Sequence, residues 1–141
     1  MTLYNVIREL ERIAMTHPNV RTAKDGSVYE IMNASPSVKY GAFVVTQNKH
    51  YQQGQFDHYG LTLFFIDRLV SDMEDNRLQI QSFAKQVLGN IINVFCEEYD
   101  LDVPIIRYQP FTQKFADECA GQYAQIELEI PLDILCPEEY E

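Results

Sequence analysis

The feature that most constrains this chain is a strand-like apolar run followed closely by a long amphipathic helix, within residues 59–95. In the run YGLTLFFID, one face of a strand would carry Tyr59, Leu61, Leu63 and Phe65. A helix is predicted over residues 77–98, where apolar residues recur at spacings of three and four: Ile80, Phe83, Ala84, Val87, Leu88, Ile91, Val94 and Phe95. We expect these two elements to form the centre of the core.

The second face of the same strand also becomes apolar towards its end, where Phe64 and Ile66 flank Phe65. A strand that is apolar on both faces needs a cover on each side. We expect helix packing on one face and a neighbour on the other, for which another subunit is a candidate.

The N-terminal half of the chain predicts one helix and two hairpins. Residues 3–16 carry a single apolar stripe, with Thr2 as the N-cap and Pro18 ending the helix. Residues 20–31 predict a small hairpin with its turn at Gly26. Two long antiparallel strands are expected at residues 38–49 and 58–67, joined by an extended polar loop centred on Gly54.

The C-terminal part predicts strands separated by breaks. Short strands are expected at residues 105–108 and 111–115, where Pro110 suits an edge position. A loop over residues 117–121 precedes a cleanly alternating strand at residues 122–130. Residues 132–141 form an acidic tail that we expect to be mobile.

Together these elements predict one domain, residues 1–141, of the α+β class. Its sheet is mainly antiparallel with a long β-hairpin, and it packs against an N-terminal helix and a long central helix. With 141 residues and 46% hydrophobic residues, the chain is large enough for one proper core.

Charge and cysteine usage argue against several classes of function. The chain has 21 acidic and 11 basic residues, a net charge of −10, and no basic run. Binding to nucleic acid or to an anionic membrane surface is therefore disfavoured. The three cysteines are an odd number and lack the spacing of a metal site, so we expect that the protein is made in a reducing cytosol. Charged residues interrupt the apolar pattern of residues 1–14, so we expect no signal peptide there. We also expect no membrane span, because no apolar run approaches the roughly 20 residues that a span needs.

Candidate catalytic and metal groups are each explained more simply. The acids of the connector before the long helix suit helix capping better than a calcium site: Asp67, Asp72, Glu74 and Asp75. A zinc site or general base among the residues that flank the predicted hairpin loop would need a further group and a sheltered pocket, and loop histidines are usually solvated: His50, Asp57 and His58. Cys96 falls near the apolar stripe and is more simply a core residue, Cys119 lies in an acidic loop that disfavours the thiolate, and Cys136 is near the tail. We therefore expect no catalytic residues, no metal and no cofactor, and we expect that the protein is not an enzyme.

The nine tyrosines leave two interpretations open. Tyrosine suits a contact surface, because it combines a large area with a polar hydroxyl group. Ordinary packing in the core and the sheet explains the same residues equally well.

Two segments resemble the neck ring, tail-terminator and tail-completion proteins of the head-tail connector of tailed bacteriophages. Residues 64–95 read FFIDRLVSDMEDNRLQIQSFAKQVLGNIINVF, and residues 110–132 read PFTQKFADECAGQYAQIELEIPL. The first is similar to the strand, acidic connector and Gln/Ser-rich helix of these proteins, and the second to their closing loop and strand. Within that group, the comparison points first to crAss-like phages of Bacteroides-type hosts.

This resemblance implies a virion structural protein, made in the host cytoplasm, that forms a homo-oligomeric ring of twelve or six copies between portal and tail. The resemblance also implies that subunit sheets join edge to edge or face to face around a channel, through which DNA passes without sequence-specific binding. The implied contacts are with the portal or neighbouring ring proteins and with tail proteins. On this chain the candidate interface lies in the hairpin, at Phe43, Val45, His50, Tyr51, Gln52, Gln53, Gln55, Phe56, Phe64 and Ile66.

The residues alone also allow an alternative from another class. A small cytosolic α+β binding module or enzyme would use a cleft between sheet and helix. Such a protein would hold His50 and His58 in one pocket together with a carboxylate.

Overall fold

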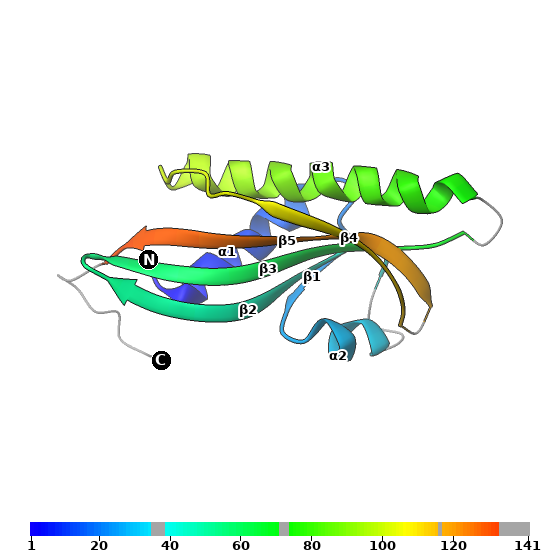
Figure 1. Ribbon diagram of the computed structural model, residues 1–141, viewed down its shortest axis with the longest axis horizontal. Coiled ribbons are helices and arrows are strands. Elements are labelled where there is room, and N and C mark those ends of the chain that lie inside the picture. Colours follow the sequence, from blue (N-terminus) through cyan, green and yellow to red (C-terminus); the bar gives the residue numbers. More distant parts are fainter. Residues whose placement is uncertain (35–38, 71–73, 116, 133–141) are drawn as a thin grey trace.

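The computed structural model describes residues 1–34, 39–70, 74–115 and 117–132. Within them, one sheet has the strand order β1-β2-β3-β5-β4, with helices on both of its faces (Figure 1). The elements in chain order are α1 (Leu3–Thr16), β1 (Thr22–Asp25), α2 (Val28–Asn33), β2 (Ala42–Gln53), β3 (Phe56–Arg68), α3 (Glu74–Glu98), β4 (Arg107–Lys114) and β5 (Glu118–Pro131).

The sheet separates two apolar clusters. α1 and α3 cover one face, the α1/α3 face, and the short α2 covers one end of the opposite face, the α2 face. β1 pairs with β2 in parallel, and every other neighbouring pair is antiparallel. The structure thus confirms the predicted α+β class, with its N-terminal helix, long central helix and long hairpin.

Helix α1 forms as its sequence predicts. The Thr2 side chain accepts a hydrogen bond from the Asn5 backbone N–H at 3.2 Å, which satisfies one otherwise unpaired donor of the first turn. Its apolar stripe is buried at Val6, Ile7, Leu10, Ile13 and Ala14.

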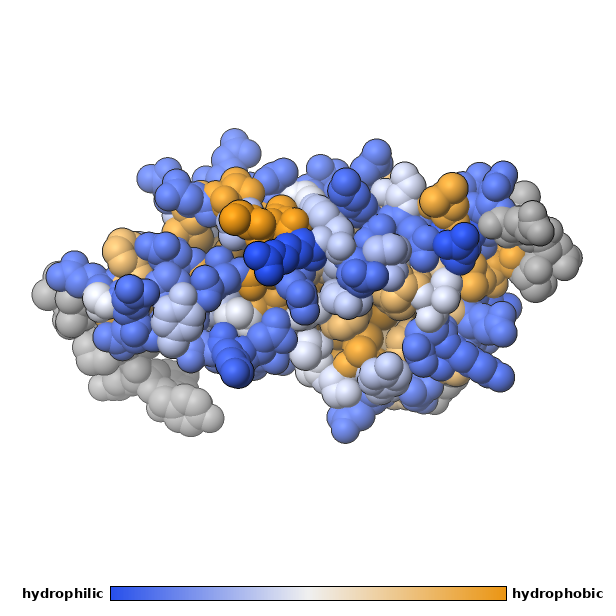
Figure 2. Space-filling model, viewed as in Figure 1, coloured by the Kyte–Doolittle hydropathy of each residue, from blue (hydrophilic) through white to orange (hydrophobic). Residues whose placement is uncertain are grey.

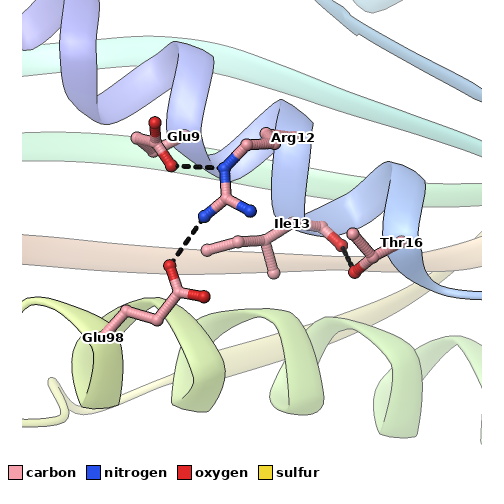
Figure 3. Close-up of polar contacts among 5 residues, drawn as sticks. All are labelled: Glu9, Arg12, Ile13, Thr16 and Glu98. Atoms are coloured by element: carbon pink, nitrogen blue, oxygen red, sulfur yellow. Dashed lines mark hydrogen bonds and ion pairs between the residues drawn. The ribbon is translucent and has the colours of Figure 1, made fainter.

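An exposed ion-pair network joins the outer surfaces of α1 and α3 (Figure 3). Arg12 donates from Nε to Glu9 at 2.6 Å and from Nη2 to Glu98 of α3 at 2.7 Å. Because these groups are solvated, the packing of the two apolar stripes holds the helices together far more than this pairing does.

β3 and β5 form the centre of the sheet. Their side chains alternate between the faces as predicted, and Tyr59, Leu61, Leu63 and Phe65 all lie in the α1/α3 cluster. β5 begins at Glu118, so the loop predicted over residues 117–121 is largely strand. Across the sheet, β4 runs without a break through Pro110, which sits on the edge strand where its missing N–H is tolerated.

The prediction of a small hairpin over residues 20–31 is wrong. Residues 22–25 form β1, which pairs with β2, and residues 28–33 form α2. Met32, on α2, is only 2% exposed and packs in the second cluster. A run this short fits a strand and a helix about equally well, and here the tertiary contact decides.

The extended polar loop predicted around Gly54 is a tight turn instead. β2 continues to Gln53 and β3 starts at Phe56, so two residues connect them. Gly54 has a φ of 62°, a positive value that tight hairpin turns require and that glycine adopts readily. The strands of the hairpin are therefore longer than predicted, and the connection between them is shorter.

The second apolar face of β3 is buried at one end and half-buried beside it. Ile66 is fully buried in the cluster that contains Met32, Phe115 and Cys119. Phe64 is half-buried, with its ring centroid 5.4 Å from that of Tyr123. At Ile66 the expected cover is thus α2, whereas at Phe64 contact with a neighbouring subunit stays a prediction.

Helix α3 starts at Glu74, three residues before the predicted start. Residues 71–73 of the acidic connector lie outside the described residues, and Asp72 with them. Asn76 accepts a hydrogen bond from the Val70 backbone N–H at 2.8 Å, so it ties the connector to the helix. The buried stripe includes Ile92 and Cys96, whereas the predicted Phe83 and Val94 are 38% and 42% exposed.

Candidate assembly surface

The sheet has a three-stranded part that projects beyond its shorter outer strands. β1 pairs only with residues 42–45 of β2, and β4 pairs only with residues 118–125 of β5. Residues 46–53, 56–62 and 126–131 therefore form what we call the sheet arm. In the part of the chain that the structure describes, no strand pairs with the outer side of the arm at β2 or at β5.

The backbone of β5 directs hydrogen-bonding groups towards its open side. Leu132 donates its N–H to the Gln55 carbonyl oxygen at 2.8 Å. Because bonding direction alternates along an antiparallel pair, Glu127 and Glu129 direct their N–H and C=O groups away from β3. Pro131 ends this open edge without an N–H.

The backbone of β2 does the same on the opposite side of the arm. Gly26 donates its N–H to the outward carbonyl oxygen of Val45 at 2.9 Å, where β1 ends. A bulge between Gln47 and His50 then shifts the register. Beyond the bulge, His50 and Gln52 direct their backbone groups to the open side.

Aromatic and charged side chains gather on the α2 face of the arm. The Tyr51 ring stacks on the His58 ring, with centroids 4.4 Å apart and planes within 4°. His58 Nδ1 lies 3.8 Å from Glu127 Oε2. The Tyr51 hydroxyl also bonds with Glu127, which raises the pKa of that hydroxyl above its usual value. The carboxylate of Glu127 thus leans across β3 towards β2.

The α1/α3 face of the arm is more closely packed. The rings of His50 and Tyr59 meet edge to face, with their centroids 5.4 Å apart. The Tyr59 hydroxyl donates to Asp57 at 3.1 Å. Burial, and then the nearby carboxylate of Asp57, raises the pKa of Tyr59 to about 12.

The structure does not bring the candidate catalytic groups together. His50 pairs with Tyr59 and His58 pairs with Tyr51, so the two histidines lie on opposite faces of the hairpin. Among the described residues, no three metal-ligating side chains gather in one place. The alternative function requires one pocket that holds both histidines, and such a pocket would have to pass through the sheet.

The cysteines are placed in the interior as far as they are described. Cys96 and Cys119 are buried, and burial raises the pKa of both thiols, that of Cys119 to about 11. Cys136, like the rest of the predicted tail after residue 132, lies outside the described residues.

The ten predicted interface residues divide into three groups by burial. Phe43, Val45 and Ile66 are 0% exposed in the core of one chain, so their side chains do not suit an interface. Phe64 is half-buried against other rings. The remaining six are exposed, five of them on the arm and Gln55 in the turn that joins β2 to β3: His50, Tyr51, Gln52, Gln53, Gln55 and Phe56.

Sequence reasoning missed the open edge of β5 and the surface beside it. A shallow hollow of about 380 Å³ adjoins this edge and is lined by Pro104, Ile105, Arg107, Gln125, Ile126 and Glu127. Figure 2 shows apolar side chains gathered where the chain passes from α3 to β4. Ile105 is 80% exposed there. The available signal was Pro104, which stands just before the late start of β4.

No protein-family model matches this chain, and none of the curated proteins compared with it is detectably similar in sequence. Among the described residues, no helix is both long and apolar enough to span a membrane. The geometry of the sheet arm and its open edges is therefore what bears most directly on function.

Proposed function

We propose that this protein is a non-enzymatic virion component that forms a homo-oligomeric ring in the portal–tail connector of a bacteriophage, as a neck ring or tail terminator. The observation that carries the proposal is the sheet arm with an open edge on each side. Its motivation from sequence is the resemblance of residues 64–95 and 110–132 to proteins of that connector.

Open strand edges favour assembly. An exposed edge presents unpaired N–H and C=O groups, and proteins usually cover, shorten or charge such edges. Here two edges of different sequence lie on opposite sides of one arm. When two different surfaces of a protein recognise each other, the contact is heterologous and produces a closed ring if the rotation closes.

The described surface supports contact more than catalysis. Its hollows are shallow and open, and the largest exposed side chains include Tyr29, Tyr51 and Phe56. The net charge of −10 suits a channel through which DNA passes without sequence-specific binding, because like charges keep the duplex from adhering. The proposed partners are further copies of this chain, the portal or adjacent ring proteins, and tail proteins, with no membrane.

Mass photometry and cryo-electron microscopy of the purified protein, alone and mixed with the portal protein, test this function. We expect a ring of twelve or six copies, or a ring that forms on the portal. A protein that stays monomeric and binds neither portal nor tail proteins would refute the proposal. Portal and tail genes beside its own gene would be independent support.

A further inference from the structure

We infer that neighbouring copies join by pairing the open β5 edge of one copy with the open β2 edge of the next, so that one sheet continues across the subunit boundary. This inference rests on the proposed ring and specifies its contact. The partner of each edge is thus a second copy of this chain.

The strand directions are compatible with this joint. β2 is antiparallel to β3, and β3 is antiparallel to β5, so β2 and β5 of one chain run in the same direction. Copies repeated around an axis along the strands keep that direction, and the joint is therefore a parallel pair. The outward backbone groups of Glu127 and Glu129 would then bond with those of His50 and Gln52 of the next copy.

Charge selects this joint over a symmetric one. At pH 7, Glu127 and Glu129 are the charged side chains of residues 126–131, and Lys49 is the charged side chain of residues 46–53. Pairing β5 with β5 would place the Glu129 carboxylates of two copies near one another, which is unfavourable. Pairing β5 with β2 brings the carboxylate of Glu129 towards Lys49 of the next copy instead.

Each edge also has an exposed apolar side chain beside it. Of the large apolar side chains that the structure describes, Ile105 at 80% and Tyr4 at 68% are the most exposed. Ile105 lines the hollow next to Glu127, and Tyr4 lines a second hollow next to Gln47 of β2. A joint between the two edges removes part of both side chains from water, which favours association.

Cross-linking of single-cysteine variants tests which edges meet. In a Cys136→Ser background, a tagged Gln53→Cys chain and an untagged Glu129→Cys chain, whose new thiols lie on the same face of the sheet, are co-expressed and treated with a short bismaleimide. We expect the product of intermediate size, one tagged chain linked to one untagged chain. Links mainly between two untagged chains would show a β5–β5 joint and overturn the inference. The Cys136→Ser parent, whose remaining thiols are buried, gives the background reaction.

Charge reversal supplies an independent test by mass photometry. Lys49→Glu and Glu129→Lys should each raise the protein concentration at half assembly by about tenfold, and the double variant should restore it. Lys114→Glu and Glu118→Lys, exposed charges at the opposite end of the sheet, are the matched controls. A ring that is unaffected by either arm variant overturns the inferred joint and leaves the proposed function standing. A wild-type protein that forms no ring refutes the function itself.

Discussion

Gly121 on β5 lies directly against the backbone of Phe65 on β3, and a Cβ atom at residue 121 would overlap the Phe65 carbonyl oxygen. Backbone cannot move aside as a flexible side chain can, so the two central strands would have to separate. We therefore expect Gly121→Ala to lower the free energy of unfolding by about 3 kcal/mol, measured by urea denaturation.

Gly54→Ala is the matched control for this substitution. Gly54 has a φ of 62° but no neighbouring atom within 4 Å of the added Cβ. Alanine there should cost about 1 kcal/mol, from backbone strain alone. Equal effects of the two substitutions would mean that the close approach of β5 to β3 does not limit stability.

The different burial of two leucines predicts a second contrast in stability. Leu10 is 0% exposed in the main cluster, whereas Leu78 on α3 is 61% exposed. Leu10→Ala leaves a cavity and should cost about 3 kcal/mol in unfolding free energy. Leu78→Ala should change it by less than about 0.5 kcal/mol. If both substitutions had small effects in chemical denaturation, α1 would not be packed as described.

The elements that the sequence predicted well are those whose pattern repeats over several turns or pairs. α1, α3, β3 and β5 follow from periodicity, because one buried face imposes it along the whole element. Residues 20–31 failed because β1 is short and pairs in parallel with a strand distant in sequence. The helical conformation of α2 likewise depends on a tertiary contact, the packing of Met32 in the second cluster.

The candidate assembly surface was only half predictable. The hairpin tip is visible as Gly54 within a polar stretch, but Phe43, Val45 and Ile66 were assigned to the surface although they are core. Whether a strand edge is open depends on where its neighbour begins. For β5 that neighbour is β4, which pairs only as far as Gln125. No local pattern in residues 126–131 reveals this.

Tyr59 predicts a loss of stability at high pH. Its pKa is raised from 10.0 to about 12, mainly by burial and then by Asp57, so the folded state holds the proton more tightly than the unfolded state. The stability from this group is therefore complete below pH 10 and is lost as the pH rises towards 12. Tyr40, Tyr51, Tyr99 and Tyr108 also have raised pKa values and act in the same direction.

Tyr59→Phe removes the contribution of this hydroxyl group to the pH dependence of stability. Urea denaturation at pH 9 and pH 11 should show a smaller decrease in unfolding free energy for the variant than for the wild type. At pH 9 the variant should be less stable, because Asp57 loses its hydrogen bond. An identical decrease in both proteins would show that the Tyr59 hydroxyl is not sheltered as described.

The buried cysteines predict slow thiol chemistry in the folded protein. Cys119 is 0% exposed, and burial together with the acidic groups around it raises the pKa of its thiol to about 11. Cys96 is 1% exposed, and burial followed by Asp102 raises its pKa as well. Because the thiolate is the reactive form, both residues should react with a disulfide reagent at pH 8 far more slowly than a free thiol does. The measurement uses Cys136→Ser protein, with and without urea. Two thiols should become reactive together on unfolding, and rapid labelling of Cys119 in the folded protein would contradict its position between β3, β4 and α2.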